Sequence, residues 1–264
     1  LMLTAGLRAD NHQLFGSELS PRAYLVWEAS PALVVKGGFG HAFKAPTLKQ
    51  ISPNYVGAEG PHTFAGNANI QPESSNSFEV GADWQAAPGW TLRATVFNTE
   101  VKDLITYRLL RTEGTRRFYQ YDNVDAARIR GLEAGVVWDI SRAWSWSNDL
   151  TLLNTRDKTT GQKLADRPSS SLTSRLEWKD ATGWSARVSA EFIGSQTATG
   201  GGALPSYALW SASVGKRIAL EAQRTLVLRA GLENIGNVNL AEKSENFGYA
   251  ERARRLFASA RVDF

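Results

Sequence analysis

The 264-residue chain contains no cysteine, which excludes a disulfide framework, a thiolate metal site and a cysteine nucleophile. Histidine is scarce too: His12, His41 and His62 are the only three, and none lies in a recognisable protease or lipase motif. The glycines of "GFGHAFKAP" are not followed by a helical pattern, so they do not indicate a phosphate-binding loop. No nucleic-acid-binding motif is present. We therefore expect no enzyme, no resident metal or cofactor and no nucleic-acid partner.

Long apolar runs are also missing. No stretch approaches the roughly 18 residues of a membrane-spanning helix, and the opening "LMLTAGLRAD" lacks the charged and apolar regions of a signal peptide. Proline is infrequent, and 42% of the residues are hydrophobic, which argues against disorder. Because the strand-like pattern begins at Leu1, we expect the sequence to be a fragment of a longer protein.

Instead, the chain shows the same two-residue alternation about a dozen times. Leu92, Ala94 and Val96, for example, alternate with Arg93 and Thr95. Similar patterns lie at 1–10, 170–178, 184–192, 225–233 and 255–264. This period is typical of strands with one apolar and one polar face, and helical periodicity is weak throughout. The sequence predicts an all-β protein of about twelve strands.

The connections between these strands alternate in length. Short ones such as "QAAPGWT", "KDATGWS" and "ALEAQRT" (219–225) are separated by longer polar ones such as "DNHQLFGSELS" (10–20), "RTEGTRR" (111–117) and residues 46–75 and 236–251. Eight of the nine tryptophans lie close to short connections, and Trp210 is the exception. A soluble β-sandwich gives no reason to sort tryptophan to one end of its strands. The pattern predicts a transmembrane antiparallel β-barrel with an aromatic girdle, whose last strand ends at Phe264 on the periplasmic side.

Several segments carry a more specific resemblance. They are "GFGHAFKAPTLKQ", "GNANIQPESSNSFEVGADW", "FNTEVKDLIT", "YDNVDAARIRGLEAGVVW", "LADRP", "LPSYALWSASVGKR" and "GLENIGN". In this order and spacing the chain resembles TonB-dependent outer-membrane receptors along its whole length. It is most similar to the ferric-siderophore branch, which includes ferric enterobactin and colicin I receptors.

The resemblance implies a specific architecture and partners. Members have barrels of about 22 strands with a plugged lumen, and residues 1–264 would form the last twelve strands, without the plug domain and the first strands. It implies a monomer in the bacterial outer membrane, in contact with outer-membrane lipid and lipopolysaccharide. It would import a ferric siderophore, of catecholate type, with energy from the TonB complex acting through the absent plug. Phe264 resembles the C-terminal signal read by the barrel-assembly machinery.

The chain departs from the common family pattern at three places. Before the last strand it has Glu251, Arg252, Ala253 and Arg254 in place of Glu-Pro-Gly-Arg. Ser170 stands where histidine is common, and Asn237 replaces a frequent aspartate. These differences concern local loop conformation and leave the predicted fold unchanged.

A basic and aromatic segment is the first candidate ligand site. Residues 107–121, "YRLLRTEGTRRFYQY", contain four arginines and one acid, interleaved with aromatic residues. An aromatic trianion such as a ferric catecholate suits this composition through charge and ring contacts. The alternatives are contact with lipopolysaccharide phosphates and a solvated loop tip. The predicted ligand-binding residues are Arg108, Arg111, Arg116, Arg117, Tyr119 and Tyr121.

The long connection after "FKAP" is the second candidate, because loops above about 15 residues without regular structure are commonly functional. Its predicted ligand-binding residues are Lys49, Tyr55, His62 and Phe64. His41 and His62 raise the alternative of a haem receptor. Such receptors typically read "FRAP", whereas this chain reads "FKAP".

The third candidate, "NVDAARIRGLE", is predicted to face the plug through Arg128, Arg130 and Glu133, with structural packing as its main role. Three alternatives to a siderophore receptor remain at this point. They are a receptor for haem or another TonB-dependent substrate, an independent 12-stranded channel, and a membrane-embedded enzyme.

Overall fold

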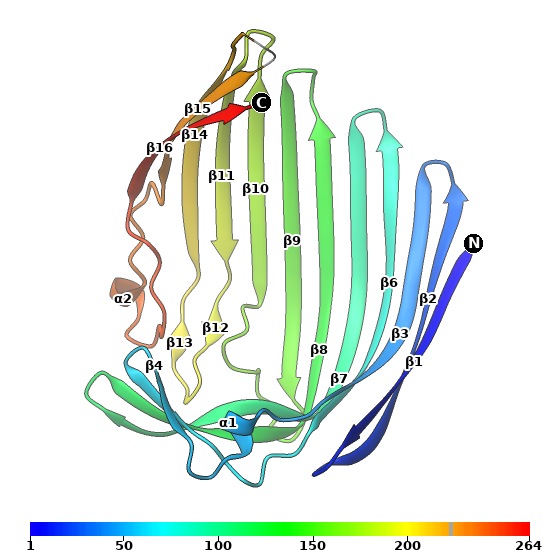
Figure 1. Cartoon of the computed structure of the whole chain (residues 1–264), viewed down its shortest axis with the longest axis vertical. Helices are drawn as coiled ribbons and strands as arrows, with labels where there is room; N and C mark the ends of the chain where they lie inside the picture. The colour runs from blue at the N-terminus through cyan, green and yellow to red at the C-terminus, as the bar shows by residue number, and fades with distance from the viewer. Residues whose placement is uncertain (222–223) are drawn as a thin grey trace.

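A computed structural model describes residues 1–221 and 224–264 (Figure 1). The strands are β1 (Met2–His12), β2 (Gly16–Ser30), β3 (Leu33–Lys44), β4 (Val56–Glu59), β5 (His62–Ala65), β6 (Glu73–Ala87), β7 (Trp90–Glu113), β8 (Arg116–Asp139), β9 (Trp144–Asp157), β10 (Ser170–Lys179), β11 (Trp184–Ile193), β12 (Gln196–Thr197), β13 (Ala203–Leu204), β14 (Tyr207–Ala219), β15 (Thr225–Glu233) and β16 (Arg255–Asp263). The two helices are single turns, α1 (Leu48–Ile51) and α2 (Leu240–Lys243). Within the described residues, no helix is long and apolar enough to cross a membrane.

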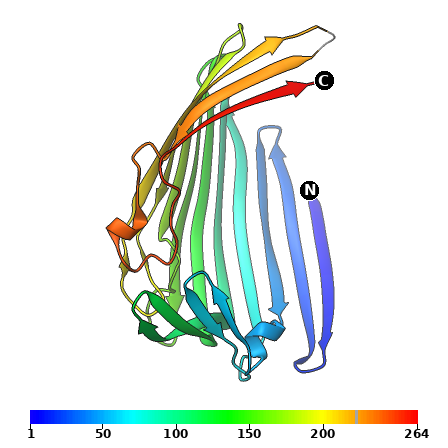
Figure 2. The ribbon, with the colours of Figure 1, turned by 60° about the vertical axis from the view of Figure 1, so that its left-hand side comes forward.

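Twelve strands form one continuous antiparallel meander. Their order is β1-β2-β3-β6-β7-β8-β9-β10-β11-β14-β15-β16, and the small strands β4 and β5 and the pair β12–β13 lie off this path. The sheet is strongly curved, with β1 and β16 as the two edges of the path (Figures 1 and 2). The prediction of an all-β antiparallel sheet of about twelve strands is confirmed.

Four short connections and four long ones lie at opposite ends of the sheet, as predicted. Residues 31–32, 88–89, 140–143 and 180–183 join strands at the end that is uppermost in Figure 1. The predicted short connection at 219–225 includes residues 222–223, which lie outside the described part. Residues 45–72, 158–169, 194–206 and 234–254 occupy the other end. We refer to these as the short-turn end and the long-loop end.

Two connections expected to be long loops are instead tight turns between extended strands. Strands β1 and β2 leave only residues 13–15 between them, and β7 and β8 leave only residues 114–115. The segment 107–121 is therefore the tip of a β-hairpin and not a loop. Its turn passes through Gly114, whose φ of +59° strongly favours glycine. The alternation of aromatic and polar residues beside this glycine fits paired strands.

The tryptophans gather at the short-turn end, as predicted. Trp90 of β7 stands opposite Trp138 of β8, and their rings stack with centroids 4.7 Å apart. Trp144 and Trp178 are likewise paired across β9 and β10. An amphipathic ring row of this kind is typical of a membrane–water boundary.

The register separates an apolar convex face from a polar concave face. On the convex side Val80, Val96 and Val188 are each about half exposed, so they have no protein core to pack against. The concave side carries ion pairs between neighbouring or near strands, including Lys36–Asp83 at 2.8 Å, Arg187–Glu177 at 2.6 Å and Arg93–Asp149. This is the inside-out distribution expected of a barrel wall in lipid.

Candidate functional site

Four connections meet at the long-loop end (Figures 1 and 2). They are the β3–β6 connection, the tip of the β7–β8 hairpin, the β11–β14 connection with β12 and β13, and the β15–β16 connection with α2. Because consecutive strands are antiparallel, every second connection reaches the same end of the sheet. Residues far apart in the chain thus form one surface.

The β3–β6 connection folds back onto the β7–β8 hairpin. Strand β5 pairs in parallel with β8, placing Phe64 opposite Tyr119. The side-chain amide of Asn67 donates a hydrogen bond to the Tyr121 carbonyl at 3.1 Å, which attaches the β3–β6 connection to β8 at a second point. The first and second predicted sites therefore lie in contact.

An aromatic cluster fills the space between them. Phe64 stacks on Tyr119 at 5.1 Å and meets Tyr107 edge-on at 5.2 Å. Tyr121 joins the same buried cluster, and Tyr55 packs against it while partly buried. Phe64, Tyr119 and Tyr121 are at most 9% exposed, so these predicted ligand residues pack the loops together in this arrangement.

Lys49, also predicted to bind ligand, lies on α1 beside this cluster. Its ammonium group is 3.3 Å from a Glu59 carboxylate oxygen and 5.9 Å from the centre of the Tyr121 ring. The charge of Lys49 is therefore partly neutralised within its own connection.

Two of the four predicted arginines have carboxylate partners. Arg108 lies 3.2 Å from Asp122 across the hairpin, and Arg111 lies 2.7 Å from Glu113. The Arg111 guanidinium also covers the Phe118 ring at 3.8 Å. Both side chains are exposed, so these pairs add little stability but reduce the local positive field.

Arg116 and Arg117 have no carboxylate partner among the described residues. Arg116 is exposed next to the hairpin turn. Arg117 is half-buried and donates to the backbone carbonyls of Glu245 and Asn246 at 3.1 and 3.3 Å. These bonds orient the Arg117 guanidinium and join β8 to the β15–β16 connection, while leaving its charge uncompensated.

A pocket of about 620 Å³ lies where the four connections meet. Arg117 lines it together with His62, Phe247 and Tyr249, and Gly200 and Gly201 form another side. The rings of Phe247 and Tyr249 meet edge-on at 5.6 Å. The pocket thus combines an uncompensated cation with aromatic rings.

The glycine run 200–202 permits this close approach. All three residues have φ near +90°, a region that other residues rarely adopt. A β-carbon on Gly200 would lie 2.6 Å from Leu109, and one on Gly202 would lie 2.5 Å from the Asn246 side chain. The run therefore lets the β12–β13 hairpin sit directly against β7 and the β15–β16 connection.

His62 contacts both the pocket and the aromatic cluster. Its ring meets Tyr119 edge-on at 5.9 Å, and its Nδ1 is buried with no hydrogen-bond partner among the described residues. Burial, and secondarily the charge of Arg117, lower the pKa of His62 below its ordinary value. The neutral imidazole is therefore favoured.

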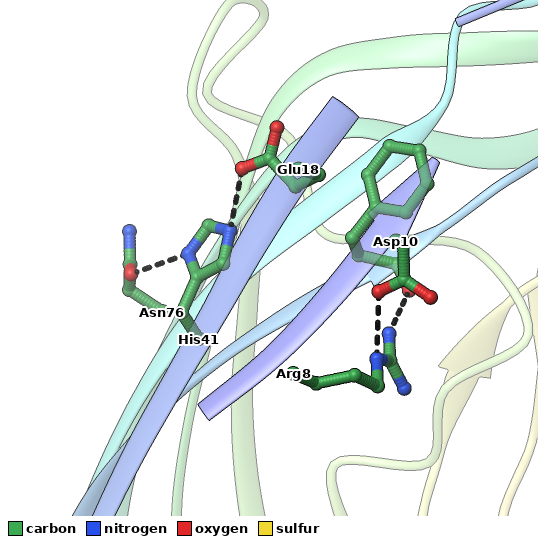
Figure 3. Close-up of polar contacts among 6 residues, drawn as sticks. Arg8, Asp10, Glu18, His41 and Asn76 are labelled. Atoms are coloured by element: carbon green, nitrogen blue, oxygen red, sulfur yellow. Dashed lines mark hydrogen bonds and ion pairs between the residues drawn. The ribbon is translucent and has the colours of Figure 1, made fainter. Parts of the chain in front are cut away.

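His41 belongs to a separate polar group near the β1 edge (Figure 3). Its Nε2–H donates to the Glu18 carboxylate at 3.1 Å, and its Nδ1 lies 2.9 Å from Asn76 Oδ1. In the same view Arg8 pairs with Asp10 at 2.7 Å. Both ring nitrogens of His41 are engaged, so His41 offers no free nitrogen for the haem alternative.

The three residues predicted to face the plug do not share a face. Glu133 stands opposite Thr95 and Thr151 on the concave side. Arg128 and Arg130 have the other parity and lie on the convex face, where Arg130 Nε donates to Asn98 at 2.8 Å. The prediction is wrong for both arginines, because an odd separation along an unbroken strand reverses the direction of a side chain.

Phe264 follows the last residue of β16. Asp263 pairs with Thr225 at the start of β15, which places Phe264 at the short-turn end. It is 92% exposed, and the Arg224 guanidinium lies 5.1 Å from its ring centre. This position fits the predicted periplasmic location, while the assembly-signal role stays a prediction.

Sequence reasoning missed the pocket residues of the β15–β16 connection. Phe247 and Tyr249 form the aromatic side of the pocket, and the carbonyls of Glu245 and Asn246 hold Arg117. The pair of aromatic residues in an otherwise polar long loop was the only available signal.

Comparison with known proteins agrees with this geometry. Residues 1–235 match the family model described as TonB dependent receptor-like, beta-barrel. The chain is 28% identical to the ferric enterobactin receptor PirA of Pseudomonas aeruginosa, over 100% of the chain and 39% of PirA. It is 29% identical to the ferrienterobactin receptor of Escherichia coli K12, over 74% of the chain and 28% of that receptor.

Solved structures give the same result. The siderophore receptor PirA from Pseudomonas aeruginosa superposes with a TM-score of 0.73 at 26% identity, covering 99% of the chain and 45% of PirA. The ferric enterobactin receptor PfeA gives 0.76 at 25% identity, covering 99% of the chain and 43% of PfeA. The chain thus spans about two fifths of the length of the curated relatives with which it aligns throughout. The match over most of its length, together with the curved sheet and its aromatic row, shows that the chain belongs to the TonB-dependent receptor-like β-barrel family of the outer membrane.

Proposed function

We propose that the chain supplies ligand-capturing loops and part of the barrel wall of an outer-membrane receptor for a ferric siderophore of catecholate type. The observation that carries this proposal is the pocket at the long-loop end, where the uncompensated Arg117 faces a space bordered by Phe247 and Tyr249. Relatives named as ferric enterobactin receptors support the same ligand class.

The chemistry of the pocket suits such a ligand. A ferric catecholate is an anion with flat aromatic rings, so it gains both from a guanidinium and from ring contacts. Arg116 and Arg117 add positive potential that attracts an anion from solution. The buried aromatic cluster of Phe64, Tyr119 and Tyr121 would hold the loops in position and would not itself touch the ligand.

We propose further that residues 1–264 form the C-terminal portion of a larger barrel that encloses a plug. The open edges of β1 and β16 and the roughly two-fifths coverage of the relatives support this arrangement. Transport would be energised by TonB through the plug, and the protein would catalyse no chemical reaction. An independent 12-stranded barrel would instead have to join β1 to β16, and the sheet path does not do so among the described residues.

Growth on defined iron sources tests the proposed ligand class. A strain lacking its own siderophore receptors would receive the full-length gene and be supplied with ferric enterobactin, a ferric hydroxamate or haemin as sole iron source. We expect growth on ferric enterobactin alone. Growth on haemin alone would replace the proposed ligand with the haem alternative.

A second measurement separates binding from energised import. In a strain without TonB, cells carrying the receptor should still bind radioactive ferric enterobactin at the surface but should not accumulate it. Uptake that persists without TonB would favour a passive channel.

A further inference from the structure

The guanidinium of Arg117 is held by one turn of the β15–β16 connection. Its two terminal amino groups donate to the backbone carbonyls of Asn246 and Glu245, at 3.3 and 3.1 Å. Both acceptors are neutral, since Arg117 takes the carbonyl of Glu245 and not its carboxylate. The position of this turn therefore sets the direction of the Arg117 guanidinium without neutralising its charge.

Ser244 holds the turn that carries the two carbonyls. Its hydroxyl oxygen accepts from the backbone N–H of Asn246 at 3.2 Å, and its hydroxyl donates to the carbonyl of Ala203 in β13 at 3.0 Å. The backbone N–H of Phe247 donates to the Ser244 carbonyl at 3.3 Å, which closes the turn. One side chain thus joins the turn that orients Arg117 to the β12–β13 pair.

Two further contacts fix this turn against its surroundings. Ser244 ends α2, and its backbone N–H donates to the carbonyl of the buried Leu240 at 3.1 Å. On the other side, the Asn246 amide lies against Gly202, where a β-carbon would come within 2.5 Å of the amide nitrogen. The turn is therefore anchored by α2 and by the β12–β13 pair, and the Ser244 side chain links it to the second anchor.

A guanidinium held in this way keeps donors for a ligand. Arginine has five N–H donors in a fixed planar fork, and the two carbonyls take two of them, which leaves three. Arg117 lines the pocket of about 620 Å³, so this is the space where those donors can meet an anion. A fork that is already oriented loses less conformational freedom when the ligand binds, so each bond to the ligand contributes more to affinity.

We propose that Ser244 is a positioning residue for Arg117, and that the tight contact with the ligand depends on the orientation of the Arg117 fork as well as on its charge. The inference rests on the proposed function, in which the ligand is a ferric catecholate. Each catecholate ring carries two adjacent oxygens, a spacing that suits paired N–H donors. Ser244 is not among the described residues that line the pocket, so its effect on the ligand passes through the turn.

A double-mutant cycle on the full-length receptor in detergent tests the proposal. Surface plasmon resonance would measure ferric enterobactin binding by the unmodified receptor, Ser244→Ala, Arg117→Gln and the variant with both changes. Loss of the two hydroxyl hydrogen bonds should weaken binding about threefold to tenfold when Arg117 is present. In the receptor that carries Arg117→Gln, Ser244→Ala should add less than about twofold, because its effect depends on Arg117.

The rate constants separate orientation from charge. Ser244→Ala changes no charge, so the association rate should stay within about twofold while dissociation becomes about threefold to tenfold faster. Arg117→Lys keeps the charge but lacks the planar fork, so its dissociation should be accelerated at least as much. Ser244→Thr keeps the hydroxyl and should bind within about twofold of the unmodified receptor.

Ser141→Ala is the matched control. The Ser141 hydroxyl oxygen also accepts from backbone N–H groups, those of Ala143 and Trp144 at 3.2 Å each, but it does so at the short-turn end. This variant should bind ferric enterobactin within about twofold of the unmodified receptor.

Three results would overturn the inference. They are unchanged binding by Ser244→Ala, equal weakening by Ser244→Ala with and without Arg117→Gln, and dissociation from Arg117→Lys as slow as from the unmodified receptor. The lysine variant keeps the proposal testable if Ser244→Ala fails to assemble. An unmodified receptor that does not bind ferric enterobactin would overturn the proposed function and this inference with it, whereas any of the three results with normal binding by the unmodified receptor would overturn this inference alone.

Discussion

A charge placed in the middle of the convex face should be much more costly than one on the concave face of the same strand. Ala94 lies on the convex side between Ala82 and Ala134. It is midway between the Trp90 boundary and the polar row at Asn98. Eight residues of strand span about 26 Å, and a strand tilt of about 40° reduces this to about 20 Å of apolar height. Ala94 is therefore at the bilayer midplane.

We expect Ala94→Arg to destabilise the folded receptor by about 2–4 kcal/mol, because the guanidinium meets hydrocarbon. Thr95→Arg points to the concave side beside Glu133 and should cost less than about 1 kcal/mol. Ala94→Leu preserves the apolar character and serves as the matched control.

Denaturant titrations of the full-length receptor folded into lipid vesicles measure these differences. Equal penalties at positions 94 and 95, or a larger penalty at 95, would refute the assignment of the two faces.

Further predictions concern the long-loop end. The double variant Arg116→Gln/Arg117→Gln should weaken ferric-siderophore binding at least about tenfold, mainly by slowing association. The control variant Arg142→Gln, at a short turn, should bind unchanged. Surface plasmon resonance measures the affinity and the association rate of both variants. Phe64→Ala removes the central ring of the buried cluster and should cost the docked β3–β6 connection about 3–5 kcal/mol, detected as faster proteolysis within residues 45–72 while the barrel stays intact. The pKa of His62 is lowered in the docked state, so the undocked connection binds a proton more readily below about pH 6.5. Docking should therefore weaken as the pH falls below that value, and proteolysis within residues 45–72 should accelerate. The variant His62→Gln should lose this pH dependence, and an unchanged pH profile in that variant would contradict the prediction.

The sequence alone determined the strands and the face that each residue takes. Leu92, Ala94 and Val96 alternate with Arg93 and Thr95. Because successive side chains of a strand point to opposite faces of the sheet, this alternation assigns the apolar residues to one face and the polar residues to the other. The tryptophans near short connections likewise predicted an aromatic row at the short-turn end of the sheet. These are local properties, so no knowledge of distant contacts was needed. The same rule places Arg128 and Arg130 on the face opposite to Glu133.

Only the tertiary structure decided what the long-loop end contains. The pairing of β5 with β8 buries Phe64, Tyr119 and Tyr121. From the sequence alone, these three residues were predicted to contact the ligand. The pocket joins Arg117 to Phe247 and Tyr249, about 130 residues further along the chain. The connections have no repeating residue pattern from which their packing partners could be predicted. Their packing depends on how the curved sheet brings the ends of alternate strands together. For that reason the membrane-embedded wall was predictable from the residues, while the binding surface required the fold.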